Sequence, residues 1–169
     1  GYFGCGNLGD EAILRSFTNW AGRNFPDAVI TAQSADPDST RKSHGVESVH
    51  KHSFGNILRE LRRCDAVVAP GGGLLQDSTS LKSLFYYLAL IRTAIFFRKP
   101  VYMLSQGMGP LNGKLARAAS ACVLRGCEHI AVRDEDSLKL LRSRGLPEKK
   151  IELTGDLVLL AEPDSACEE

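Results

Sequence analysis

Stretches with helical spacing of apolar residues alternate along this chain with short, continuously apolar stretches. In the segment from Asp10 to Asn24, Ala12, Ile13, Phe17 and Trp20 recur at the spacing of one helix face. Residues 65–69 read Asp-Ala-Val-Val-Ala, a run without alternation that is typical of a strand covered on both faces. The same reading predicts helices at 10–24, 54–64, 81–97, 114–127 and 134–144, a short helical stretch between 36 and 45, and strands at 28–32, 46–49, 65–69, 101–104, 129–132 and 151–154.

This order of elements predicts the fold class. Strands that alternate with helices form an α/β, Rossmann-like doubly wound parallel sheet, in which ligands bind at the carboxyl ends of the strands. Arg92 lies in the middle of the apolar segment 81–97, which favours a buried helix over a membrane span. We expect residues 1–161 to form one such domain and residues 162–169 to be a linker or surface tail.

Three glycine-rich segments follow, or are expected to follow, a strand. They are Gly4–Gly9, Gly71–Gly73 and Gln106–Gly109. Glycine lets backbone N–H groups approach a ligand closely, and a following helix start adds partial positive charge. The sequence therefore predicts an anion-binding site along one edge of the sheet. Such a turn calls for a strand before it, so we expect a central first strand that is missing from this sequence.

Composition narrows the class of protein. The 169 residues are 43% apolar and 24% charged, typical of one soluble globular domain. Twenty-one basic residues nearly balance twenty acidic ones, which argues against a nucleic-acid or membrane-surface partner. The five cysteines and four histidines show no metal-ligand spacing, so we expect reduced thiols and no metal. No signal peptide is visible, and we expect a cytoplasmic protein.

Several short segments carry a resemblance through their order along the chain. The segments are Gly1–Ala12, Gly71–Asp77, Ser105–Pro110, Val132–Asp134 with Ser137, and Gly155–Asp156. Any one glycine segment is a weak signal, but five segments in this order are specific. Together they resemble the polysaccharide pyruvyl transferase family, in particular the bacterial branch that acts on secondary cell-wall polymers in cell-surface anchoring.

The resemblance implies an activity. Members of the family transfer the enolpyruvyl unit of phosphoenolpyruvate to two hydroxyls of a sugar, giving a pyruvate ketal and phosphate. Phosphoenolpyruvate would be the donor substrate, with no further cofactor, and a lipid-linked, polymeric or nucleotide-linked saccharide the acceptor. The family resembles two-domain GT-B enzymes, and the Arg-Leu-His signature of its carboxyl-terminal domain has no counterpart here. We therefore expect this chain to be inactive alone, and a peripheral position at the inner membrane face is compatible with its substrates.

Arg133 and Asp10 are the candidate catalytic residues. Arg133 follows a predicted strand on the ligand edge, where a guanidinium would grip the carboxylate or phosphate of the donor. The alternative for Arg133 is a surface ion pair with Asp134 or Asp136. Asp10 is either a base that binds the sugar or a helix cap, whereas Glu11 is expected to be an ordinary first-turn charge.

The remaining candidates are assigned to substrate binding. They are Gly4, Gly6, Asn7, Gly9, Gly71, Gly72, Gly73, Gln76, Asp77, Gln106 and Gly107. Three structural alternatives remain open: Asn7 as a turn residue, Asp77 or Ser78 as a cap of the helix from Leu81, and Gln106 in a local turn bond. Asp156 is expected near a domain hinge or as a helix cap. His44, His50 and His52 are expected to be solvated.

Two other functions fit the same glycine segments. One is a GT-B glycosyltransferase that uses a nucleotide sugar, and the other is a non-catalytic nucleotide-binding module. Gly4–Gly9 fits the dinucleotide pattern GxGxxG. A dinucleotide cofactor is nevertheless disfavoured, because the carboxylate expected about twenty residues later, after a second strand, is not clearly placed.

Overall fold

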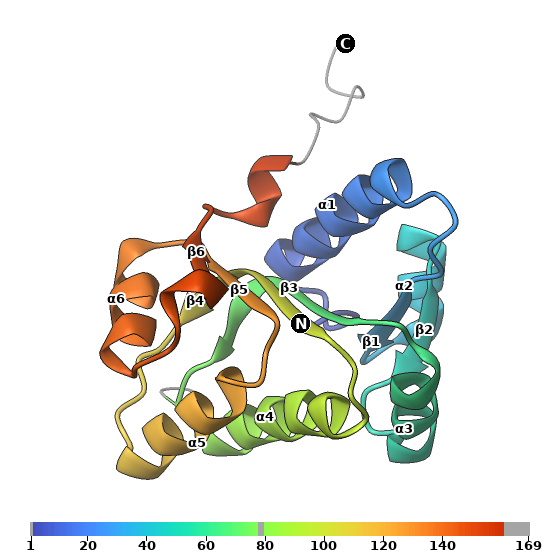
Figure 1. The fold of residues 1–169 in the computed structure, drawn as a ribbon. Helices are drawn as coiled ribbons and strands as arrows, with labels where there is room; N and C mark the ends of the chain where they lie inside the picture. The colour runs from blue at the N-terminus through green and yellow to red at the C-terminus, as the bar shows by residue number, and fades with distance from the viewer. Residues whose placement is uncertain (1, 78–79, 161–169) are drawn as a thin grey trace.

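The computed structural model describes residues 2–77 and 80–160, which form alternating helices and strands (Figure 1). The α-helices are α1 (Leu8–Asn24), α2 (Pro37–His44), α3 (Phe54–Arg63), α4 (Leu81–Phe96), α5 (Lys114–Leu124) and α6 (Glu135–Ser143). The strands are β1 (Thr31–Ser34), β2 (Glu47–His50), β3 (Val67–Leu75), β4 (Val101–Met108), β5 (His129–Val132) and β6 (Ile151–Leu153). Two 3-10 helices, η1 (Glu148–Lys150) and η2 (Leu157–Leu160), follow α6 and β6. The predicted tail 162–169 lies outside the described residues.

All strand pairs are parallel, as predicted, but the strands form two sheets instead of one. β1 pairs with β2, and β3, β4, β5 and β6 form a second sheet in that order. A doubly wound sheet has the order 3-2-1-4-5-6, and the two sheets match its two sides. No strand within residues 2–77 and 80–160 occupies the position between β1 and β3, which accounts for the division.

Helices cover the four-stranded sheet on both faces, as a Rossmann-like fold requires (Figure 1). α4, α5 and α6 share one core, in which Leu84, Leu124 and Leu141 pack with Met103 and Ile130 of the sheet. Each such fully buried side chain contributes about 1.5–3 kcal/mol of transfer free energy. The apolar segment predicted as a buried helix is α4, which lies inside this core.

α1 covers the opposite face, together with η2. Ile13 and Phe17 of α1 pack with Leu157 of η2 and with Val68 of β3. Trp20, predicted on the same inward face of α1, is instead 39% exposed and stacks edge-on with Phe25 at the end of the helix. The inward face of α1 thus continues through Ala21 instead of Trp20.

The two strands that carry glycines are longer than predicted. β3 continues through Gly71–Gly73 to Leu75, and β4 continues through Gly107 to Met108. Gly72 pairs with Gln106 and Leu75 with Met108, with an irregularity in register between them. The glycines at 71–73 are therefore a bulged continuation of a strand and not a turn. β1 also differs, beginning at Thr31 and not at residue 28.

Candidate active site

The carboxyl ends of β3, β4, β5 and β6 meet at one edge of the sheet, and the candidate residues lie along it. The segment before α1 reaches the same edge through Asp10, whose Oδ1 lies 3.6 Å from where a Cβ on Gly72 would be. Asp10 is buried and accepts a hydrogen bond from the Tyr2 N–H at 3.3 Å. Asp10 therefore joins the first glycine segment to the second.

Asn7, and not Asp10, caps α1. The Gly9 N–H donates to Asn7 Oδ1 at 3.0 Å, and the helix begins at Leu8. A side-chain oxygen at this position satisfies one of the free N–H groups of the first turn. Asn7 thus has a structural role as a helix cap and not as the turn residue expected. Asp10 lies in the first turn without capping the helix, so the capping alternative for Asp10 is wrong.

Glu11 and His44 form a contact that the sequence does not predict. Glu11 Oε1 accepts the Gly4 N–H at 2.7 Å, and Glu11 Oε2 lies 2.7 Å from His44 Nε2. The His44 side chain is only 1% exposed, and its Nδ1 has no hydrogen-bond partner. Glu11 lies in the first turn of α1, as expected, but its two contacts make it more than an ordinary first-turn charge. The expectation of a solvated ring for His44 is wrong. His50 and His52 are exposed, as expected.

The glycines of the first segment have different surroundings. Gly4 has φ +70°, and a Cβ there would lie 2.2 Å from Ser34 Oγ and 2.5 Å from the Asp36 nitrogen. Glycine at position 4 is therefore required by the packing of the segment on the turn after β1. Gly6 has φ +73° with open space around its Cβ position, and Gly9 faces only Asn7 Oδ1.

The second segment is bent between α1 and β4. Gly71 and Gly72 have φ +67° and +84°, conformations that L side chains rarely adopt. A Cβ on Gly71 would lie 3.0 Å from Ile13 Cγ2, so α1 packs directly on this strand. A Cβ on Gly73 would lie 3.8 Å from Gln76 Nε2, which places Gln76 over the same bend.

Gln106 supports this bend from inside the protein. Its Nε2 donates to the carbonyl oxygens of Ala69 and Gly71 at 2.8 Å, with a longer contact to Leu104 at 3.3 Å. Gln106 is 0% exposed, and its Oε1 has no partner. The expectation of an amide pointing into an open cleft is therefore wrong. The alternative for Gln106, a local hydrogen bond, is present as the contact with Leu104, and the two shorter bonds reach the neighbouring strand β3.

Asp77 holds the segment that precedes α5. Its Oδ1 accepts the Asn112 N–H at 2.9 Å, and its Oδ2 accepts the Gly113 N–H at 2.7 Å. The Gly113 and Asn112 backbone bonds lower the pKa of Asp77. Ser80, and not Asp77, caps α4, so the predicted capping of the helix from Leu81 by Asp77 is wrong. The other predicted cap, Ser78, lies outside the described residues.

Arg133 lies over Gly107 and between two carboxylates. A Cβ on Gly107 would lie 2.9 Å from Arg133 Nε, so the guanidinium occupies the space that a side chain would fill. Arg133 Nη1 is 3.4 Å from Asp156 Oδ2, and Arg133 Nε is 3.6 Å from Asp134 Oδ2. Of the two ion-pair partners expected for Arg133, Asp134 is confirmed and Asp136 pairs with Lys139 instead.

Asp134 and Asp156 also cap the helices that follow them. Asp134 accepts the Ser137 N–H at 2.7 Å, and Asp156 accepts the Val158 N–H at 3.1 Å, which confirms the capping alternative for Asp156. Burial raises the pKa of Asp134, but the Ser137 bonds and the Arg133 charge outweigh it and leave the pKa lowered. Both carboxylates thus contact Arg133 and help to fix where its guanidinium points.

This arrangement is suited to binding an anion. The Arg133 side chain is 41% exposed, so an incoming carboxylate or phosphate can reach it and compete with Asp156. Asp10 and the bend at Gly71–Gly73 lie on neighbouring elements of the same edge. Within residues 2–77 and 80–160, no group of three or more His, Cys, Asp or Glu side chains is arranged to hold a metal ion.

Comparison with known families agrees with the order of these segments. A sequence model of the polysaccharide pyruvyl transferase family matches residues 7–166. The chain belongs to the polysaccharide pyruvyl transferase family. It is therefore a member of a family of transferases that act with a saccharide acceptor. Neither curated proteins nor solved structures gave a match. None of the helices described here is both long enough and apolar enough to span a bilayer.

The edge cluster of this pyruvyl transferase family member brings together residues from every predicted segment. The contacts described above link each residue to the next, in the order Asp10, Gly72, Gln106, Gly107 and Arg133. Their roles toward a substrate are predictions. The sequence does not predict the contact of Glu11 with His44, because His44 lies 33 residues away on α2 and a first-turn acid gives no sign of a distant partner.

Proposed function

We propose that this protein transfers the enolpyruvyl unit of phosphoenolpyruvate to a saccharide and forms a cyclic pyruvate ketal. Membership of the family supports the general reaction, and the position of Arg133 is the observation that carries the donor assignment. A half-exposed guanidinium on Gly107, at the carboxyl edge of a parallel sheet, presents a planar fork of donors to solvent. That fork matches a carboxylate or phosphate better than a lysine would.

The reaction requires proton transfers that the edge cluster can serve. One sugar hydroxyl adds to the enol carbon that bears phosphate, the methylene carbon gains a proton, and phosphate leaves. The second hydroxyl then closes the ketal. Of the two protons that the hydroxyls lose, one ends on the new methyl group and the other on the phosphate that leaves. We assign Asp10 to accept a hydroxyl proton, because its carboxylate lies beside the bend at Gly72.

In this proposal Arg133 exchanges its ion pair with Asp156 for the donor anion. The exchange keeps the guanidinium paired in both states, which limits the cost of desolvating it. The hydrogen bond from the Val158 N–H would then hold the Asp156 carboxylate in place after its ion pair with Arg133 is broken. The acceptor side of the site would be lined or supported by the glycine segments and by Asn7, Gln76 and Asp77. Gln106 would act indirectly, through its hydrogen bond to the Gly71 carbonyl.

The acceptor we propose is a sugar of a cell-wall or exopolysaccharide precursor carried on lipid or nucleotide, in the cytoplasm. No cofactor beyond the donor substrate is needed for the bond changes described. The Rossmann-like fold would serve as one half of a GT-B-like enzyme, with the substrates bound between two domains. The carboxyl edge, where the candidate residues lie, is the surface that such a partner domain would face.

The test is an assay of the protein with phosphoenolpyruvate and a panel of amino-sugar and hexose acceptors. Phosphate release that depends on the acceptor, together with a mass gain equal to a pyruvate ketal, is the expected result. Release of a nucleoside diphosphate from a sugar nucleotide, with no phosphate from phosphoenolpyruvate, would favour the glycosyltransferase alternative. Because the resemblance implies a second domain, the same assay is run on the protein joined to that domain.

A further inference from the structure

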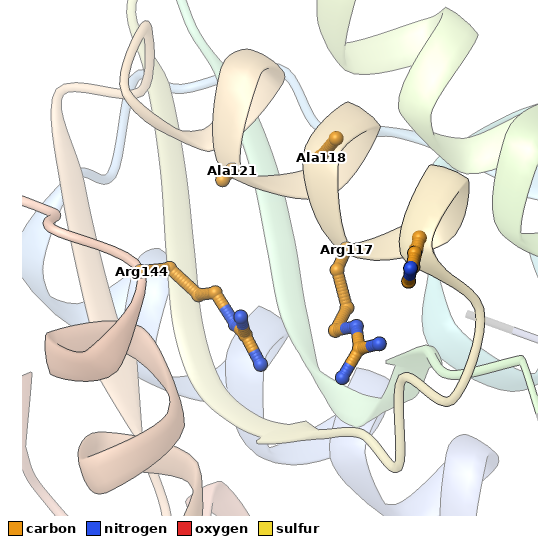
Figure 2. Close-up of a pocket in the computed structure, with 5 residues that line it drawn as sticks. Arg117, Ala118, Ala121 and Arg144 are labelled. Atoms are coloured by element: carbon orange, nitrogen blue, oxygen red, sulfur yellow. The ribbon is translucent and has the colours of Figure 1, made fainter.

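A basic pocket lies between α5 and the chain that follows α6 (Figure 2). Its volume is about 430 Å³, and it is lined by Lys114, Arg117, Ala118, Ala121 and Arg144. Three of these five residues are cations, and none is acidic. None of them belongs to the cluster of candidate residues around Arg133, so the pocket is a separate feature of the surface.

Two elements bring the cations together. Lys114 and Arg117 are three residues apart on α5 and so share one face of that helix. Ala118 and Ala121 beside them are small and leave the space hollow. Figure 2 shows the Arg117 side chain leaving α5 and the Arg144 side chain extending toward it from the other wall. The Arg144 carbonyl accepts a bond from Arg125 Nη2 at 2.9 Å, which fixes the backbone of that wall.

The three cations differ from the basic side chains of α6 in their ion pairing. Within the described part of the chain, no carboxylate lies within ion-pair distance of Lys114, Arg117 or Arg144. The Nε of Arg144 is buried and makes no hydrogen bond. Arg142, two residues earlier, shows the usual arrangement, with a two-pronged contact to Glu148 at 3.0 Å. A buried N–H donor without an acceptor is unfavourable, and facing cations repel each other, so an anion would relieve both.

We propose that this pocket binds the phosphate group of a small molecule or lipid. Two guanidinium groups and an ammonium suit a doubly charged oxyanion, since arginine forks bond to phosphate oxygens in pairs. The pocket is open to solvent and has room for a phosphate with part of its attached group. The proposal does not depend on the proposed transferase reaction, because the two sets of residues are distinct.

The experiment measures phosphate binding by the full chain. Inorganic phosphate is titrated by calorimetry and by thermal unfolding, with potassium chloride at matched ionic strength as the salt control. The expected result is saturable binding that falls about tenfold or more in Arg117→Gln and in Arg144→Gln, since each removes a charged hydrogen bond. Arg59→Gln, which removes an exposed charge from α3, is expected to leave binding unchanged.

A second variant guards against a folding defect. Ala118 is exposed on α5, so Ala118→Glu adds a carboxylate to the pocket without removing any existing contact. Glutamate is well tolerated in a helix, and this variant is expected to fold and to lose phosphate binding. Binding that survives both Arg117→Gln and Ala118→Glu would overturn the proposal.

Two further arms locate the site and the source of the phosphate. Phosphate is a product of the proposed reaction, so the titration is repeated with Arg133→Lys, and binding at the basic pocket is expected to persist. Loss of binding in Arg133→Lys alone would place the phosphate at the donor site instead and overturn the proposal. Co-sedimentation with phosphatidylcholine vesicles, with and without phosphatidic acid, distinguishes a lipid headgroup from a free phosphate. Arg117-dependent co-sedimentation only with phosphatidic acid would identify a lipid, and its absence a soluble ligand.

Discussion

Gly107 and Arg133 are in direct contact where β4 and β5 end. A Cβ atom at position 107 would lie 2.9 Å from both Nε and Nη2 of the guanidinium. The Arg133 N–H also donates to the Gln106 carbonyl at 3.2 Å, so the backbone fixes the base of the side chain beside this glycine. Gly107 therefore sets the position of the Arg133 guanidinium beside the strand ends that carry Gly72 and Gly107.

Gly107→Ala tests whether that position matters for the reaction. Gly107 does not have a positive φ, and the groups that a methyl would meet are the end of a flexible side chain. We expect the free energy of unfolding to change by less than about 1 kcal/mol, because the guanidinium can move aside. Activity, measured as phosphate release from phosphoenolpyruvate, should fall about tenfold or more, because even a small displacement of a substrate-binding group is costly.

Gly22→Ala is the matched control for this glycine substitution. Gly22 lies inside α1 with nothing within 4 Å of its Cβ position. Alanine there should stabilise the protein by roughly 0.5–1 kcal/mol and leave activity unchanged. Full activity in Gly107→Ala would show that the reaction does not depend on the position of the Arg133 guanidinium.

Arg133→Lys tests the donor assignment itself. An ammonium retains the charge but cannot bond to a carboxylate or phosphate through two parallel N–H groups. Loss of one charge-assisted hydrogen bond costs about 1.5–3 kcal/mol. We therefore expect kcat/KM for phosphoenolpyruvate to fall by about tenfold or more, each 1.4 kcal/mol being a factor of about ten.

Arg142→Lys provides the control for that substitution. Arg142 is exposed and makes a two-pronged contact with Glu148, so the same chemical change occurs outside the edge cluster. Its kcat/KM should match that of the unchanged protein. If Arg133→Lys releases phosphate at the unchanged rate, Arg133 does not contact the donor.

Much of the fold is readable from the sequence because the pattern of apolar residues is local. The strand predicted at 129–132 is β5, and its neighbours in the sheet follow from strand–helix alternation. The length of β3 is not local information. Gly71 and Gly72 have the preferences of a turn, but pairing of Gly72 with Gln106 on β4 keeps them in the sheet.

The contacts of the site also include some that the local sequence predicts and some that depend on how distant elements pack. The glycine segments and Arg133 could be predicted because each follows a strand, and the carboxyl ends of parallel strands meet at one edge. The partners of Gln106 and Asp77 depend on which strand lies beside which, and on the path of the segment before α5. The pairing of Glu11 with a buried His44 similarly requires α1 and α2 to pack together. No spacing within one element contains that information.

Gln106→Met tests the internal support of the bend in β3. Methionine has a similar length but no donor, so the Ala69 and Gly71 carbonyls would lose the N–H groups 2.8 Å away. We expect unfolding in urea to show a loss of about 1–3 kcal/mol, the cost of leaving buried polar groups without partners. Gln33→Met, which removes a single half-buried bond to Tyr86, should cost less. Equal losses in the two variants would contradict this role for Gln106.

Gly4→Ala and Gly6→Ala separate packing from ligand binding in the first segment. Both positions have positive φ, which costs an L-residue about 1–2 kcal/mol. At Gly4 the added Cβ would also meet the Asp36 backbone at 2.5 Å, whereas at Gly6 it would meet nothing within 4 Å.

Gly4→Ala should therefore destabilise the protein well beyond the backbone cost, and Gly6→Ala by that cost alone, as measured by thermal unfolding. If the space beside Gly6 receives the acceptor, Gly6→Ala will also raise the KM for the saccharide. A Gly4→Ala variant as stable as Gly6→Ala would mean that the segment does not pack on the turn after β1.

Acid unfolding tests the role of Asp77. The Gly113 and Asn112 bonds lower the pKa of the folded carboxyl, so its contribution to stability is present above its ordinary value of about 3.9. That contribution is lost as the pH falls from this value through the lower folded pKa, since protonation is then favoured in the unfolded chain. Asp77→Ala should reduce the free energy of unfolding at neutral pH and flatten its decline on acidification.

Hydrogen exchange of the Asn112 and Gly113 amides provides a local test of the same contact. Asp77→Ala should accelerate their exchange, whereas the control Asp38→Ala, which removes a carboxylate from α2, should leave it unchanged. Protected amides in Asp77→Ala would show that this segment is held in place by other contacts.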